Sequence, residues 1–236
     1  MLLLAFETSA KACSVALVRD GKLLAENYQN SGLTHSQTLL SMAQATLHAC
    51  GLRPQEVEAV AVAAGPGSFT GVRIGVAAAK GFAWGLEIPC VGVSTLEAMA
   101  ENAGVLQGTV VPVMDARRSQ VYNALFQAKD GVLTRIAPDR ALSLEELGAE
   151  LSLCDAPVCL IGDGSTLTWQ TLKDTVPGLI LPPEHRMHQR ATGVALVGER
   201  MLRSGAACDG ATLLPNYLRL SQAERERLER EKAKEA

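Results

Sequence analysis

The sequence predicts an α/β protein made of two related halves, each a mixed β-sheet with flanking helices. Two turn motifs carry the prediction: Asp20-Gly21 and Asp130-Gly131 each follow an alternating apolar segment and are typical of tight hairpins. An acidic residue closes the first apolar segment of each half, Glu7 in one and Asp115 in the other. Helical segments follow the strands in both halves, which favours mixed sheets with helical cover and an internal duplication.

The first half begins with a short apolar run that is suited to a strand buried on both faces. It continues as a three-stranded antiparallel meander, and then as strands that alternate with helices. The expected strands are Leu2–Phe6, Cys13–Arg19, Lys22–Gln29, Val57–Ala64 and Pro89–Val93. The expected helices are Ser36–Cys50, with Thr34 before it and Gly51 as its stop, Thr70–Leu86, and a third from Thr95 to Asn102.

The second half repeats this order less regularly. Its expected strands are Thr109–Met114, Gln120–Ala128, Val132–Ile136 and Val158–Ile161, and its expected helices are Leu144–Leu151, Thr166–Thr171 and Gly193–Ser204. We therefore divide the chain into lobes 1–104 and 105–220 and a charged extension 221–236. Because Leu228 is the only apolar residue larger than alanine in that extension, we expect a solvated, partly helical segment.

Composition excludes several classes of protein. The chain of 236 residues is 47% hydrophobic and 20% charged, which suits a packed core rather than a disordered chain. No apolar run approaches the ~18–20 residues of a membrane helix, and MLLLAF lacks the basic start of a signal peptide. The net charge of −3 argues against strong independent binding to nucleic acid. The six dispersed cysteines are expected to be buried thiols of a cytoplasmic protein.

A glycine-rich loop, Gly65–Gly71, joins the fourth expected strand to the next helix. It lacks the Gly-Lys-Ser/Thr of a P-loop, and its glycine spacing departs from the dinucleotide-binding fingerprint. Two interpretations stay open: a rigid turn or partner contact, and a phosphate cradle that includes Gly65 and Gly67. Glu7 and Asp115 likewise either cap their own turns or face each other across a cleft and hold a magnesium–phosphate group.

The helix after that loop contains two rows of small residues at a spacing of four. One row is Gly71, Gly75 and Ala79, and the other is Ala77, Gly81 and Gly85. Glycine destabilises a helix interior by about 1 kcal/mol relative to alanine, so these rows need a compensating reason. We interpret them as sites where another helix backbone approaches closely.

Enzymatic motifs are absent from the sequence. There is no G-x-S-x-G nucleophile elbow and no HExxH zinc motif, and the four histidines form no pattern typical of a metal site.

Several segments resemble the TsaB (YeaZ) family. The resemblance covers residues 1 to about 220, and its most specific block is GPGSFTGVRIG. The matching segments are Glu7-Thr8-Ser9, Ala12–Leu17, Gly65–Gly75, Gly92–Leu96, Met114–Arg117 with Val121-Tyr122, and Pro215–Arg219. The family belongs to the ASKHA superfamily of actin-like and ribonuclease H-like folds with two duplicated lobes. Glu7, where aspartate is usual, and Gln120, where glutamate is frequent, depart from the family pattern.

The resemblance implies a non-catalytic scaffold and activator in a bacterial complex. With the catalytic paralogue TsaD and the ATPase TsaE, this complex forms N6-threonylcarbamoyladenosine at position 37 of tRNAs that read codons beginning with A. TsaD carries a metal-binding H-x-x-x-H motif where this chain has Thr95 and Met99. A hydroxyl and a thioether are poor replacements for two imidazoles, so the resemblance implies that this chain has no transfer site.

The resemblance also implies a docking face on helices Ser36–Cys50 and Thr70–Leu86. We expect TsaD to contact it, and a second copy of the chain when TsaD is absent. No metal or cofactor is expected on this chain, since partner subunits handle ATP and magnesium, and tRNA is expected only through the complex. The candidate partner-binding residues are His35, Leu39, Met42, Thr70, Arg73, Ile74, Gly75, Ala78, Lys80 and Gly81.

Two alternatives remain at this stage. In the first, the chain is an ATP-binding ASKHA enzyme or a metal-dependent peptidase that acts alone, with Glu7, Asp115, Gly65 and Gly67 around the nucleotide. In the second, the C-terminal lobe contacts tRNA through Arg117, Arg118, Arg135, Arg140 or the charged extension.

Overall fold

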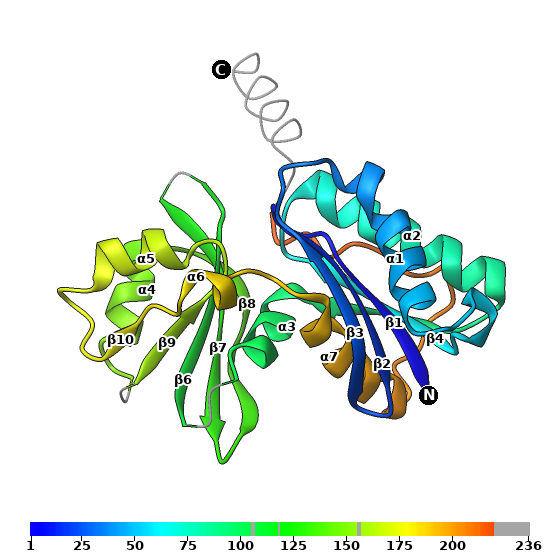
Figure 1. The fold of residues 1–236 in the computed structure, drawn as a ribbon. Helices are drawn as coiled ribbons and strands as arrows, with labels where there is room; N and C mark the ends of the chain where they lie inside the picture. The colour runs from blue at the N-terminus through cyan, green and yellow to red at the C-terminus, as the bar shows by residue number, and fades with distance from the viewer. Residues whose placement is uncertain (105–106, 118, 155–156, 220–236) are drawn as a thin grey trace, which may run out of the picture.

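The computed structural model describes residues 1–104, 107–117, 119–154 and 157–219. The charged extension 221–236, predicted to be partly helical, lies outside the described residues, as does Arg118. The described chain forms two lobes side by side, each built on one five-stranded sheet (Figure 1).

The first sheet has the strand order β3-β2-β1-β4-β5. Its antiparallel part is the predicted meander, and its parallel part pairs β1 with β4 and β4 with β5. The bounds are β1 Leu2–Glu7, β2 Cys13–Arg19, β3 Lys22–Gln29, β4 Ala59–Gly65 and β5 Cys90–Ser94. A short 3-10 turn, Pro54–Glu56, precedes β4.

Helices cover both faces of this sheet, which explains why β1 is apolar from Leu2 to Phe6. Leu2, Leu4 and Phe6 face helices α1 (His35–Ala49) and α2 (Phe69–Leu86). Leu3 and Ala5 face α7 (Ala191–Arg203) on the opposite side. Alternate side chains of a strand point to opposite faces, so a strand between two helical layers has no solvent face and needs no polar residue.

The second sheet repeats the order of the first, as β10-β9-β6-β7-β8. Here β6 takes the place of β1 and pairs antiparallel with β7 and parallel with β9. The internal duplication is therefore confirmed. The bounds are β6 Gly108–Asp115, β7 Gln120–Lys129, β8 Val132–Ser143, β9 Val158–Ile161 and β10 Leu179–Ile180. Helices α4 (Leu144–Leu151) and α5 (Ser165–Leu172) cover one face and α3 (Thr95–Asn102) the other; α6 spans Glu184–Met187.

Two predictions about the second half are wrong. Strand β8 extends to Ser143 rather than Ile136, because register shifts near Leu125 let β7 and β8 continue pairing after the apolar alternation ends. Helix α7, assigned to the lobe 105–220, packs instead on the first sheet, where Val194 and Ala195 contact Ala61 and its neighbours in one core cluster. The first lobe therefore contains two segments that are distant in sequence.

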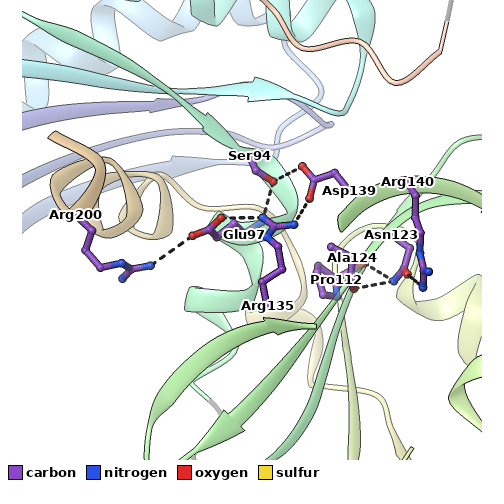
Figure 2. Close-up of polar contacts among 9 residues, drawn as sticks. All are labelled: Ser94, Glu97, Pro112, Asn123, Ala124, Arg135, Asp139, Arg140 and Arg200. Atoms are coloured by element: carbon purple, nitrogen blue, oxygen red, sulfur yellow. Dashed lines mark hydrogen bonds and ion pairs between the residues drawn. The ribbon is translucent and has the colours of Figure 1, made fainter. Parts of the chain in front are cut away.

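A polar junction fixes one lobe against the other near the start of α3 (Figure 2). The Ser94 hydroxyl donates to Asp139 of β8 at 2.5 Å. Arg135 donates to Asp139 at 2.5 Å and to Glu97 of α3 at 2.7 Å. Arg200 of α7 lies 3.8 Å from Glu97. Partly buried charged groups that share partners keep their relative positions better than isolated surface ion pairs do. This junction therefore restrains rotation of one lobe against the other.

Within the part of the chain that the structure describes, no helix has the length and apolar character to cross a membrane.

Candidate functional site

Helices α1 and α2 lie next to each other on the outer side of the first lobe (Figure 1). Their inward residues belong to the core cluster around Phe6. Their outward side carries two large exposed hydrophobic residues: Leu40 is 56% exposed and Trp84 is 83% exposed. Isolated exposed leucines are common, but a nearly fully exposed tryptophan beside a row of glycines is typical of an interaction surface.

The two small-residue rows of α2 face opposite ways. A Cβ added at Gly75 would meet the Thr8 side chain and lie 3.2 Å from Val62, and one at Gly71 would meet the Thr8 carbonyl oxygen. At Gly81 and Gly85 an added Cβ has no described heavy atom within 4 Å apart from the chain neighbours and the adjoining backbone of α2 itself. The row Gly71, Gly75 and Ala79 therefore allows α2 to approach its own sheet, and the row Ala77, Gly81 and Gly85 lies on the outward side.

This arrangement corrects three of the predicted partner-binding residues. Leu39 and Met42 are 1% and 6% exposed and belong to the core, and Gly75 packs on the sheet. The spacing of four in α2 was correctly identified, but one of its two rows serves internal packing. Of the other predicted residues, Thr70, Arg73 and Gly81 are exposed, and His35, Ile74, Ala78 and Lys80 are half-buried.

We define the outward face as the exposed residues of α1 and α2 apart from Ser36, Gln37, Ala49 and Thr70 near the helix ends, and use this name below. It comprises Leu40, Ser41, Gln44, Ala45, His48, Arg73, Ala77, Gly81, Trp84 and Gly85. Sequence reasoning missed Leu40 and Trp84. Trp84 follows Ala77 by seven residues and Gly81 by three, so helical spacing alone places it in line with the small-residue row.

A groove of about 980 Å³ lies at the C-terminal end of this face. Its walls are the end of α2, including Gly81 and Trp84, and the segment 207–211. Lys80 joins the two walls: its Nζ donates to the carbonyl oxygens of Ala211 and Leu213, both at 3.1 Å.

A second cavity, of about 560 Å³, lies between the lobes. The loop 66–70, the turn 114–117 and the segment 216–219 line it. At its edge the Phe69 and Tyr217 rings stack with centroids 4.6 Å apart, and the Arg73 guanidinium lies 3.8 Å from the Phe69 centroid. Arg73 Nε also donates to the Tyr217 hydroxyl at 2.8 Å. The C-terminal segment is thus anchored to the start of α2.

The structure brings together only part of the predicted nucleotide site. Gly67 and Asp115 line the cavity between the lobes, whereas Glu7 and Gly65 do not. A Cβ at Gly65 would meet the Asn216 backbone, and one at Gly67 would lie 2.5 Å from the Ser9 carbonyl oxygen. The glycines of this loop therefore permit close approach of the chain's own backbone.

Known proteins are similar to this chain in both fold and sequence. YeaZ from Pseudomonas aeruginosa superposes with a TM-score of 0.77 at 29% identity, over 92% of this chain and 99% of that chain. The ethanolamine utilization protein EutJ from Carboxydothermus hydrogenoformans (TM-score 0.52, 13% identity, 84% of this chain and 90% of that one) shares the fold alone. A family model described as "TsaD: tRNA N6-adenosine threonylcarbamoyltransferase" matches residues 29–226. The "tRNA threonylcarbamoyladenosine biosynthesis protein TsaB" of Bacillus subtilis is 36% identical, over 98% of this chain and 100% of that protein.

The chain belongs to the TsaB (YeaZ) family. The "tRNA threonylcarbamoyladenosine biosynthesis protein TsaB" of Escherichia coli is 33% identical, over 93% of this chain and 95% of that protein. The expected fold of two α/β lobes is thereby confirmed for this TsaB-family chain.

The two symmetric acids of this TsaB-family chain make the same local contact. Glu7 Oε1 accepts a hydrogen bond from Ser9 N at 2.6 Å, and Asp115 Oδ1 accepts one from Arg117 N at 2.7 Å. Each acid therefore caps the turn that follows its own strand, which is the first of the two interpretations offered above. Glu7 is fully buried and Asp115 is exposed, so they do not form a symmetric pair across the cavity.

Glu7 has an unusual electrostatic environment. The pKa of Glu7 is raised from 4.5 to about 7, chiefly by burial and in smaller part by the nearby Asp163, while the hydrogen bonds from Ser9 oppose the shift. Its Oε2 atom has no hydrogen-bond partner among the described residues. Burial also raises the pKa of Asp163, which accepts from the Gln189 side chain at 2.8 Å.

Glu7 is expected to make the protein less stable as the pH rises from about 4.5 to about 7. In that window the folded chain keeps a proton on Glu7 that the unfolded chain has released, so the free energy of unfolding falls, by about 3 kcal/mol in total. Urea unfolding between pH 5 and 8 should show this slope in the wild type and a flatter one in Glu7→Gln. Glu145→Gln, at an exposed position, is the control, and equal slopes in all three proteins would contradict the prediction.

The positions expected to replace two histidine ligands lie in α3. Thr95 and Met99 are both fully buried, and Met99 packs with Leu96 and Met114 in the core between α3 and the second sheet. No group of three or more histidine, cysteine or acidic side chains that could hold a metal ion occurs among the described residues.

The arginines of the tRNA-contact alternative are partly engaged within the protein. Arg135 pairs with Glu97 and Asp139, and Arg140 pairs with Glu150. Arg117 is exposed. These pairs reduce the positive charge that the second lobe offers to a phosphate backbone.

Proposed function

We propose that this chain acts in tRNA threonylcarbamoyladenosine biosynthesis as the non-catalytic subunit that docks and activates TsaD. The supporting observation is the outward face of α1 and α2, where Trp84 follows an open row of small residues on α2 and Leu40 is exposed on α1. The modification would be made by TsaD on adenosine 37 of tRNAs that read codons beginning with A.

The outward face suits a helical partner. Glycine and alanine at positions 77, 81 and 85 leave a shallow strip into which a second helix can bring its backbone close. Trp84 in line with the strip, and Leu40 exposed on α1, supply large apolar contacts of the kind that anchor stable interfaces. A related lobe of TsaD presenting its own helix pair would bury on the order of 1,200–2,000 Å² in total, the size of a specific interface.

Three further assignments belong to this proposal. The buried positions of Thr95 and Met99 support a chain without its own transfer site, because neither side chain can reach a bound ion without unpacking the core. ATP and magnesium would be handled by partner subunits, TsaE among them, and tRNA would be met only through the complex. In the absence of TsaD, a second copy of this chain would cover the outward face, and the protein would act in the cytoplasm.

The proposal is tested by titrating the purified chain into TsaD of the same organism in a calorimeter. Leu40→Glu places a charge in the proposed interface and should weaken binding at least tenfold, whereas Leu153→Glu, at a residue of the second lobe that is 87% exposed, should not. Equal affinities of the two variants would overturn docking at this face. Binding of magnesium-ATP to the isolated chain, or turnover of threonylcarbamoyl-adenylate by it, would overturn the non-catalytic assignment.

A further inference from the structure

The last described segment of the chain is a strap that crosses the first lobe. We define the strap as residues 204–219, which follow α7 and run back past β5 and α2 (Figure 1). Lys80 holds its middle, as described above, and Asn216 N donates to the Ala64 carbonyl oxygen at 2.6 Å near its end. Its beginning is held by Cys208, which forms an isolated antiparallel bridge with Cys90 on the edge strand β5.

The two cysteines of this bridge lie directly opposite each other, with their side chains in contact. Their backbones exchange two hydrogen bonds, Cys90 N to Cys208 O and Cys208 N to Cys90 O, both 2.9 Å. In such a pair the Cα atoms lie about 5.5 Å apart, which is within the range that a disulfide spans. The Sγ atoms are 3.7 Å apart, so rotations about the two Cα–Cβ bonds bring them to the ~2.05 Å of a disulfide without moving the backbone.

The two thiols differ in access. The sequence predicted six buried thiols, yet only Cys13 and Cys90 are buried, and Cys50, Cys154, Cys159 and Cys208 are half-buried. Cys208 lines the groove of about 980 Å³ and is reached from solvent through it. Cys90 is fully buried beneath the strap, so a reagent meets Cys208 first.

We propose that Cys90 and Cys208 form a redox-active pair that closes to an intramolecular disulfide by exchange with a low-molecular-weight disulfide such as oxidised glutathione. The argument for this modification site does not rest on docking to TsaD. Cys90 and Cys208 are both free thiols in the structure.

The exchange proceeds in two balanced steps. The Cys208 thiolate attacks one sulfur of oxidised glutathione, and a mixed disulfide forms while one glutathione thiolate leaves. The Cys90 sulfur then attacks Cys208 Sγ, the protein disulfide forms, and the second glutathione leaves. The chain loses two electrons and two protons, and one oxidised glutathione becomes two reduced glutathiones.

Burial and the neighbouring Cys208 raise the pKa of Cys90 to about 12. The thiolate is the attacking species, so the raised pKa makes Cys90 react slowly with small molecules in solution. Its reaction in this scheme is therefore the second, intramolecular step, in which Cys208 Sγ is already close. High pH therefore accelerates closure.

Closure would fix the strap covalently to the sheet. The new bond joins residues that are 118 positions apart and so removes conformational freedom from the unfolded chain. It would also immobilise one wall of the groove, because Cys208 is itself part of the segment 207–211 that forms this wall.

The test is oxidation of the full chain in glutathione buffers at pH 8, with acid quenching, thiol blocking and mass spectrometry. The wild type is expected to lose two hydrogens and to yield a linked peptide pair that contains Cys90 and Cys208. Cys208→Ser should form no such link, and Cys50→Ser should behave like the wild type. Oxidation should raise the thermal midpoint of the wild type by roughly 5–10 °C and leave that of Cys208→Ser unchanged.

Two outcomes would overturn the proposal. One is glutathione retained on Cys208 with no link to Cys90 at any buffer ratio. The other is a link that joins different cysteines. Because Cys208 is half-buried, Cys208→Ala serves as a second variant should the serine variant not fold, and circular dichroism of the reduced proteins checks their fold.

Discussion

Gly81→Leu is expected to weaken the affinity for TsaD at least ~100-fold while the chain itself stays folded. A Cβ added at this position lies more than 4 Å from every described heavy atom outside the adjoining helix backbone and chain neighbours, and Gly81 is exposed, so we expect the monomer to accommodate a leucine there. A partner helix packed against the small-residue strip would be forced outward by the new side chain and would lose its close contacts along the whole strip. Losses of more than about 2.7 kcal/mol are typical when the centre of an interface is disrupted.

The measurement is a binding titration with TsaD, with urea unfolding of each free chain alongside. Ala149→Leu, at an exposed position of α4 in the second lobe, is the matched control and should bind as the wild type does. Replacing glycine in a helix also removes its conformational cost, so free Gly81→Leu should be more stable by about 0.5–1 kcal/mol. Stabilisation without any loss of affinity would show that Gly81 lies outside the interface.

Gly75→Leu, unlike Gly81→Leu, is expected to destabilise the free chain itself. The free energy of unfolding should fall by at least ~3 kcal/mol. The leucine side chain would be directed into Thr8 and toward Val62, where a Cβ alone already lies 3.2 Å from the valine methyl group. Thr8 cannot move easily, because it is fully buried and its hydroxyl donates to the Gly71 carbonyl oxygen at 2.8 Å. Overpacking at a site that cannot relax costs more than the usual 1–3 kcal/mol.

Urea unfolding of Gly75→Leu and of Gly75→Ala measures this effect, with the alanine variant expected to lose less. Both substitutions raise helix propensity, so any destabilisation comes from packing on the sheet. A Gly75→Leu chain as stable as the wild type would contradict the assignment of this row to internal packing.

The strands and the order of the halves were predictable because their signals are local. Hairpin turns depend on Asp-Gly pairs with positive φ, which the structure has at residues 20–21 and 130–131. The central parts of β1 and β6, residues 2–6 and 110–114, are apolar because helices cover both faces of their sheets. The position of α7 was not predictable, because an amphipathic helix shows that it covers an apolar face without identifying which sheet provides that face.

The candidate site was only partly predictable for a related reason. Both rows of α2 consist of small residues, so their spacing alone does not distinguish the inward from the outward row. The neighbours carry that information: Val72, Val76 and Ala83 recur at helical spacing on the side of Gly75 and are buried. Weighing these residues with the glycines would have assigned Gly75 to the core from the sequence.

The return of α7 to the first sheet means that the two halves of this duplicated chain are not interchangeable modules. A fragment ending at residue 104 would lack the helix that shields Leu3, Ala5 and Ala61 from water, and a fragment beginning there would carry that helix with no sheet to receive it. Each half therefore depends on the other for its completion, because α7 covers a face of the first sheet and α3 covers a face of the second.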